Sequence, residues 1–129
     1  MKAKHALFSA SSAYRWLACP PSALLSAKYE DTSSSYAQEG TAAHALAQYK
    51  VLKALGRKAD DPTENLDYFN EEMDEATDAY AGYVLEQVAE AKKATTDPIV
   101  LVEQRVDFST YVPDGFGTAD ALIIADGKL

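Results

Sequence analysis

The chain of 129 residues contains one cysteine, Cys19, and therefore cannot form an internal disulfide. A lone thiol is typical of proteins from a reducing compartment, so we expect a cytoplasmic protein. No apolar run approaches the roughly 18 residues of a transmembrane helix, and we expect no membrane contact. Serines and an arginine within residues 9–15 argue against a secretory signal at the N-terminus. With 47% hydrophobic and 25% charged residues, the composition excludes collagen-like and disordered chains and predicts one globular domain.

Basic residues are absent from residues 60–90, which hold eleven acidic ones. The whole chain carries a net charge of −8, which argues against nucleic-acid binding. Residues 1–59, in contrast, hold eight basic and three acidic residues, so a mildly basic working face remains compatible with the acidic total. The acidic run is either the solvated face of a helix or an interaction surface that binds a basic protein or mimics DNA.

Periodicity and capping signals predict four helices in the first three quarters of the chain. Two short helices are expected over 9–18, where serines supply N-caps and Pro20-Pro21 ends the helix, and over 21–28. A third opens at Ser35, with Gln38 completing a capping box, and ends at Gly56 as its C′ residue. A fourth is capped by Asn70 and runs to about residue 94.

The periodicity changes after residue 98, where β-branched residues predict strands over 99–106 and 117–125. The fold class is therefore α+β or α/β, with N-terminal helices packed on a small mixed sheet. Asp126-Gly127 is a strong hairpin signal, and the sequence stops two residues later. Either these residues form a frayed tail, or the chain is the N-terminal part of a longer domain, which is our expectation. The exposed edge of 117–125 then favours homodimers by edge-strand pairing.

His44 is the first candidate functional residue. Gly40, Thr41, His44, Ala47 and Val51 lie on one face of the third helix, and we expect this small, apolar face to pack inward around the imidazole. Spacing alone leaves two interpretations open: a hydrogen-bonded core histidine or a metal ligand.

Two carboxylates are the other candidates. Asp120 shares a strand face with Leu122 and Ile124, which predicts a half-buried carboxylate that needs a cation, a metal or backbone donors. A turn-capping role is the alternative. Glu103 shares a face with Ile99 and Leu101 by alternation, and it is a candidate catalytic residue or a structural partner of Arg105 or a lysine.

Three motifs occur in an order that resembles the RecB-like branch of the PD-(D/E)XK nuclease superfamily, and more narrowly a phage-associated family of unknown function within it. They are Trp16-Leu17-Ala18-Cys19-Pro20-Pro21-Ser22, Glu39-Gly40-Thr41-Ala42-Ala43-His44 and Gly117-Thr118-Ala119-Asp120. The resemblance implies a truncated restriction-endonuclease-like core in which His44 and Asp120 bind a divalent metal. Mg²⁺ or Mn²⁺ suits such ligands, and the imidazole favours Mn²⁺.

The same resemblance implies a D/E-x-K strand, expected after Asp126-Gly127 and beyond residue 129. The function it implies is a metal-dependent DNA nuclease in phage recombination or DNA processing, in a bacterial or phage-infected cell, inactive as this fragment. Some relatives hold an iron–sulfur cluster near the position of Cys19, but the partner cysteines are missing, so we expect no cluster and a small buried thiol instead. Two alternatives stay open: a non-catalytic protein whose acidic 70–94 helix binds a partner, and a degenerate nuclease fold that only binds nucleic acid.

Overall fold

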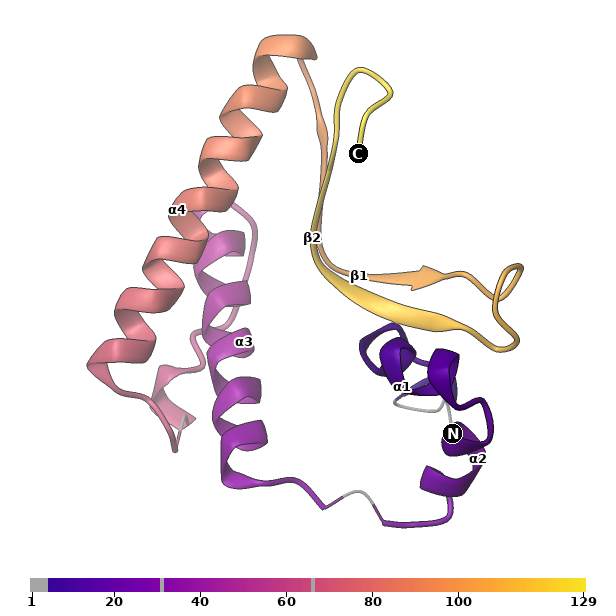
Figure 1. Cartoon of the computed structure of the whole chain (residues 1–129). Helices are drawn as coiled ribbons and strands as arrows, with labels where there is room; N and C mark the ends of the chain where they lie inside the picture. Colours follow the sequence, from indigo (N-terminus) through magenta and orange to yellow (C-terminus); the bar gives the residue numbers. More distant parts are fainter. Residues whose placement is uncertain (1–4, 31, 66) are drawn as a thin grey trace. The chain divides into compact units, whose positions relative to one another are not determined.

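A computed structural model of the chain describes residues 5–30, 32–65 and 67–129. These residues form an α+β fold of four α-helices and a two-stranded antiparallel sheet (Figure 1). The helices and strands are α1 (Ala13–Ala18), α2 (Pro21–Ser26), α3 (Ser35–Ala54), α4 (Glu71–Ala94), β1 (Ile99–Asp107) and β2 (Phe116–Ile124), with 3-10 turns at Ala10–Ser12 and Thr63–Asn65. The α+β class predicted from the sequence is confirmed, and the sheet seen in the described residues is antiparallel rather than mixed.

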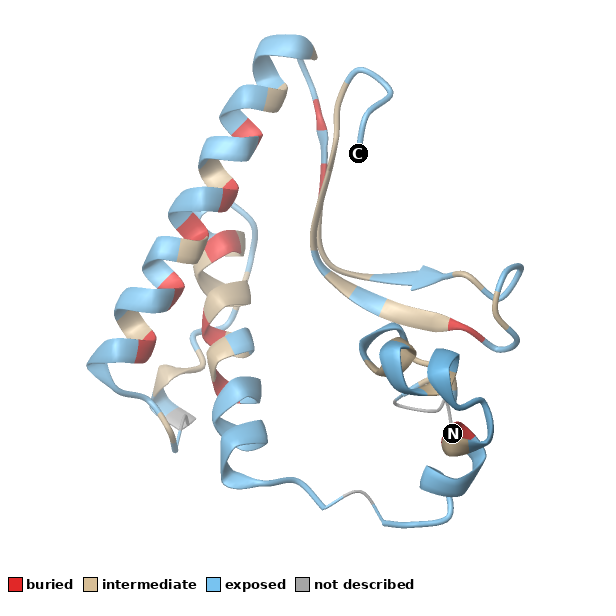
Figure 2. Ribbon diagram, in the orientation of Figure 1, coloured by how far each residue is buried: buried red, intermediate tan, exposed pale blue. Residues whose placement is uncertain are grey.

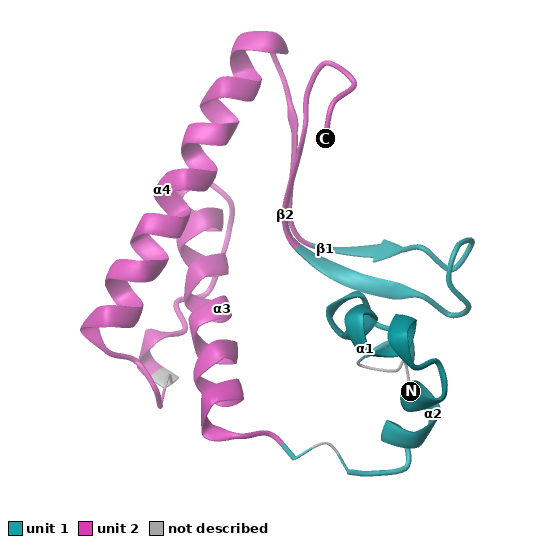
Figure 3. Ribbon diagram, in the orientation of Figure 1, with its two compact units in different colours: residues 1–32, 104–119 teal, residues 33–103, 120–129 magenta. Residues whose placement is uncertain are grey.

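The chain divides into two compact units, and the β1–β2 hairpin contributes to both (Figure 3). One unit comprises residues 1–32 and 104–119, and the other comprises residues 33–103 and 120–129. The division crosses the hairpin between Glu103 and Gln104 on β1 and between Ala119 and Asp120 on β2.

The unit of residues 1–32 and 104–119 is held by aromatic contacts around a tight loop. The Trp16 indole donates a hydrogen bond of 2.8 Å to the Ser9 carbonyl oxygen and meets the Phe8 ring edge-on. At the hairpin loop, a Cβ on Gly115 would lie 2.6 Å from the Phe108 ring, so only glycine fits there. Two expectations are wrong here: Ser9 bonds the Ser12 hydroxyl instead of capping a helix, and Cys19 is exposed rather than buried.

Helices α3 and α4 pack along one another in the other unit, and their buried residues form one stripe on each helix (Figure 2). Asn70 caps α4 as predicted, with its side-chain oxygen accepting from the Met73 amide at 2.8 Å. Gly56, at φ +72°, ends α3 in a Schellman motif, as its position predicted. The start of α3 differs by one residue, because Ser34 rather than Ser35 accepts the capping bond and Gln38 instead accepts a hydrogen bond from the Tyr68 hydroxyl.

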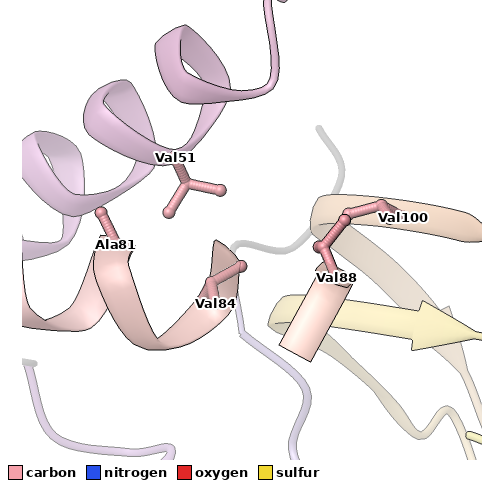
Figure 4. Packing of buried hydrophobic residues seen from close by; sticks show 5 residues of the cluster. All are labelled: Val51, Ala81, Val84, Val88 and Val100. Atoms are coloured by element: carbon pink, nitrogen blue, oxygen red, sulfur yellow. The ribbon is translucent and has the colours of Figure 1, made fainter. Parts of the chain in front are cut away.

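A cluster of valines joins the two helices to the adjacent end of the hairpin. Figure 4 shows its buried members, which come from α3, α4 and β1: Val51, Ala81, Val84, Val88 and Val100. Ala121 and Ile123 of β2 pack against the same cluster. The Arg57 guanidinium reinforces this junction by donating a 2.6 Å hydrogen bond to the Val100 carbonyl oxygen.

A charged contact also ties α3 to α4. The Lys50 ammonium lies 2.7 Å from a carboxylate oxygen of Asp74 and 2.6 Å from one of Asp78, and its side chain is only 16% exposed. Burial by itself disfavours the charged amine, but the two carboxylates outweigh it and raise the pKa of Lys50. The Lys50 ammonium is therefore engaged in a contact between α3 and α4.

Truncation of Leu46 tests how far the unit depends on this packing. Leu46 is 1% exposed, so we expect Leu46→Ala to lower the free energy of unfolding by about 2–5 kcal/mol, through lost burial and a residual cavity. The matched control is Leu24→Ala, at a leucine that is 60% exposed, which we expect to change stability by no more than about 0.5 kcal/mol. Urea denaturation followed by circular dichroism measures both; equal losses would contradict the packing described.

Candidate metal centre

Three side chains from three separate elements converge in the unit of residues 33–103 and 120–129. His44 lies on α3, Glu103 on β1 and Asp120 on β2. One potential ligand atom from each lies within 4.8 Å of the other two, and the His44 Nδ1 atom is 3.5 Å from an Asp120 carboxylate oxygen. The chain thus brings together the three residues that the sequence singled out.

His44 lies at the surface and is not a core residue. Its side chain is 64% exposed, and a Cβ on neighbouring Gly40 would meet no atom within 4 Å apart from the nearby backbone of α3 itself. The inward-packed face predicted around His44 is therefore wrong over Gly40 and Thr41, because α3 buries Ala42 and Leu46 against α4 instead. This exposure removes the core-histidine alternative and leaves the imidazole accessible to a ligand.

Glu103 enters the site through an irregularity in β1. Val100 and Val102 contact the valine cluster, so regular alternation would direct residue 103 to the opposite face. Glu103 instead has a φ of +52°, in the left-handed region, and lines the same cavity as Val102. The predicted alternation of Ile99, Leu101 and Glu103 therefore breaks at the site residue. A non-glycine residue in this conformation costs about 1–2 kcal/mol.

Asp120 lies on β2, directly before Ala121. Ala121 and Ile123 pack on the valine cluster, and Asp120 lines the same cavity as Val51 and Val102 of that cluster. Its side chain is 55% exposed. Asp120 is therefore available to a ligand without unfolding any element.

Burial and a neighbouring carboxylate disfavour the charged form of Glu103. Partial burial and the nearby Asp120 raise the pKa of Glu103, and His44 opposes this rise only in part. Burial and the same two carboxylates also raise the pKa of Tyr80, so its phenol remains protonated at neutral pH. A cation placed between the carboxylates would remove this repulsion.

The donor set fits a hard divalent cation. Two carboxylates and one imidazole are ligands of Mn²⁺ and Mg²⁺, whose bonds to oxygen are about 2.0–2.2 Å long. Atoms bound to one such ion lie about 3 Å apart in cis positions and about 4.2 Å apart in trans positions, so the three atoms, which lie within 4.8 Å of one another, would move closer together around a bound ion. The remaining coordination positions are open to water or substrate.

Tyr80 is the residue of this site that sequence reasoning missed. It packs against the valine cluster, as a core residue would. It also lines the cavity next to Glu103 and Asp120. No signal in the sequence distinguishes a core tyrosine from a site tyrosine at this position.

The raised pKa of Glu103 predicts how stability depends on pH. Because the folded state binds this proton more tightly than the unfolded state, the stabilisation it confers is complete below the ordinary value of 4.5 and is lost as pH rises through the raised pKa. We expect Glu103→Gln to gain stability relative to wild type as pH increases from about 4 to about 7 without divalent ions. Chemical denaturation at each pH measures this difference.

The control for this measurement is Glu86→Gln, at an exposed glutamate of α4. We expect its stability to follow the wild-type pH dependence. A Glu103→Gln curve that runs parallel to that of Glu86→Gln would show that folding does not raise the pKa of Glu103.

Comparison with known proteins gives the chain a family. No helix in residues 5–30, 32–65 and 67–129 is both long and apolar enough to span a bilayer. No solved structure matches the chain. Residues 5–129 match DUF2800, a family described as a protein of unknown function, and the chain belongs to that family.

Proposed function

We propose that the chain is part of a metal-dependent DNA nuclease of the RecB-like PD-(D/E)XK type, acting in the cytoplasm in phage recombination or DNA processing. The observation that carries the proposal is the convergence of His44, Glu103 and Asp120, which are separated by up to 76 positions in the sequence, within 4.8 Å. These are the residues of the Glu39–His44 and Gly117–Asp120 motifs, joined by a second acid from β1. Their donor set supports a divalent ion.

The chemistry explains why a nuclease needs this arrangement. Bound in the site, a divalent ion activates water and neutralises the charge that develops on the phosphate oxygens. The chain itself supplies two negative charges and an imidazole, which hold the ion and leave positions open. Without a cation the two carboxylates would repel a phosphodiester, so the site supports metal-dependent hydrolysis rather than direct attack by a side chain.

The catalytic lysine of this nuclease type is not on either strand described here. The chain contains two D/E-x-K triplets, Glu90-Ala91-Lys92 and Asp126-Gly127-Lys128. The first lies in α4, and the second lies in the turn after β2, where Ala125 and Lys128 pair. We therefore propose that residues 1–129 bind metal and DNA without cleaving it.

Metal binding tests the proposal directly. We expect Mn²⁺ to bind the wild-type chain with measurable affinity in a calorimetric titration, and His44→Ala and Asp120→Ala to weaken binding at least tenfold, because each removes one of three ligands. His5→Ala is the matched control, since His5 is the other histidine of the chain and lies in the other unit. Binding that is equal in the His44→Ala and wild-type proteins would contradict the proposal.

DNA binding is expected to use the basic residues near the end of α3. Lys50 and Arg57 are already committed to contacts with α4 and β1, which leaves Lys53 and Lys58 exposed. We expect Lys53→Ala with Lys58→Ala to weaken binding of a short oligonucleotide and to reduce the slope of log affinity against log salt concentration by about 1–2. Fluorescence anisotropy at several salt concentrations measures this change.

The control for the DNA measurement is Lys92→Ala with Lys93→Ala, in the last turn of α4. We expect this pair to leave the salt slope unchanged. DNA binding that is lost only in the Lys92 and Lys93 variant would contradict this expectation, and so would DNA binding that does not depend on salt. Either result would favour the alternative of a non-catalytic protein whose acidic 70–94 helix binds a partner.

A further inference from the structure

A cavity of about 190 Å³ lies directly beside the three candidate ligands. His44, Glu103 and Asp120 form part of its wall, and the exposure of His44 and Asp120 places this polar part at the solvent side. The rest of the wall is mainly apolar and comes from α3, α4 and β1: Ala43, Ala47, Val51, Ala76, Tyr80 and Val102. An ion and its phosphate need only the polar part, so the apolar part requires another explanation.

The size and lining of the cavity suit a single aromatic ring. An apolar cavity of about 150 Å³ accommodates benzene, so about 190 Å³ accommodates a six-membered ring with small substituents. The Tyr80 ring offers an aromatic surface, and the Gln48 amide offers an NH₂ group that donates hydrogen bonds to polar edge atoms and a carbonyl oxygen that accepts hydrogen bonds from them. A pyrimidine base combines these features, with an apolar face and a hydrogen-bonding edge.

The cavity is also in the right place for a base. A phosphate bound to a divalent ion at His44, Glu103 and Asp120 would carry its sugar and base within a few bonds of the adjoining apolar wall. We propose, as an extension of the proposed nuclease function, that this cavity binds an unpaired pyrimidine base of the nucleotide whose phosphate lies at the three ligands. A base within a duplex is stacked and paired, so the substrate class is single-stranded DNA or a frayed end.

Two small ligands, one with a base and one without, measure how much the base contributes to binding affinity. In calorimetric titrations of the 129-residue chain with saturating Mn²⁺, we expect thymidine 5′-monophosphate to bind at least about tenfold tighter than 2-deoxyribose 5-phosphate. The two probes share the sugar and the phosphate, so the difference reports the base alone.

Filling the cavity provides the matched variants. Ala76→Leu adds a side chain to the cavity from α4, and we expect it to remove the preference for the thymidine probe while Mn²⁺ affinity stays within about twofold of wild type. Ala89→Leu, at an exposed alanine of the same helix that does not line the cavity, should keep the preference. Ala47→Leu fills the cavity from α3 and serves if Ala76→Leu disturbs the fold, as judged by circular dichroism.

The outcomes distinguish the two proposals. Equal affinity for the two probes in the presence of bound Mn²⁺, or a preference that survives in both cavity-filling variants, would overturn the base site and leave the metal site intact. Absence of Mn²⁺ binding to the wild-type chain would overturn the proposed function and the base site together.

Discussion

The packing of the valine cluster between α3, α4 and the hairpin places the candidate site. Val51, Val84 and Val88 bury one side of the helix pair, and Val100 brings β1 onto it. Because β1 and β2 are paired, the same contact fixes Glu103 and Asp120 beside the turn of α3 that carries His44. The three side chains converge because apolar neighbours hold their backbones, and their own charges oppose the arrangement.

The site concentrates strain and repulsion that this core must offset. Glu103 adopts a left-handed backbone conformation in the middle of a strand, and its carboxylate lies beside that of Asp120. Each feature costs stability in the metal-free protein, and both bring a carboxylate into one small volume next to an exposed imidazole. Backbone strain combined with neighbouring like charges is typical of functional sites. A bound cation would attract both carboxylates and offset their repulsion.

Local signals predicted the elements well, because caps and periodicity act within a few residues. Asn70 and Gly56 mark the start of α4 and the end of α3 as their chemistry requires. The contacts between elements were harder to predict from the sequence. His44 is exposed because α3 turns Ala42 and Leu46 toward α4, and this choice between two apolar stripes depends on the partner helix.

Glu103 is an example of the same limit of sequence-based prediction, here in a strand. Alternation places residue 103 by assuming regular backbone throughout β1, and a single positive φ reverses that placement. Tyr80 was not predicted as a site residue, because it packs against the valine cluster like a core residue and also lines the cavity. The motifs thus identified His44 and Asp120 as candidate metal ligands, and strand alternation singled out Glu103, whereas the surroundings of all three required the structure.

The central claim is that one divalent ion is held jointly by the imidazole of His44 and the carboxylates of Glu103 and Asp120. Pulsed electron paramagnetic resonance of the Mn²⁺-loaded chain tests it most directly, because a directly bound imidazole nitrogen gives a ¹⁴N coupling. The account predicts this coupling in the wild-type and His5→Ala proteins and its loss in His44→Ala. A spectrum without nitrogen coupling in the wild-type protein, or a coupling that persists in His44→Ala, would contradict the account.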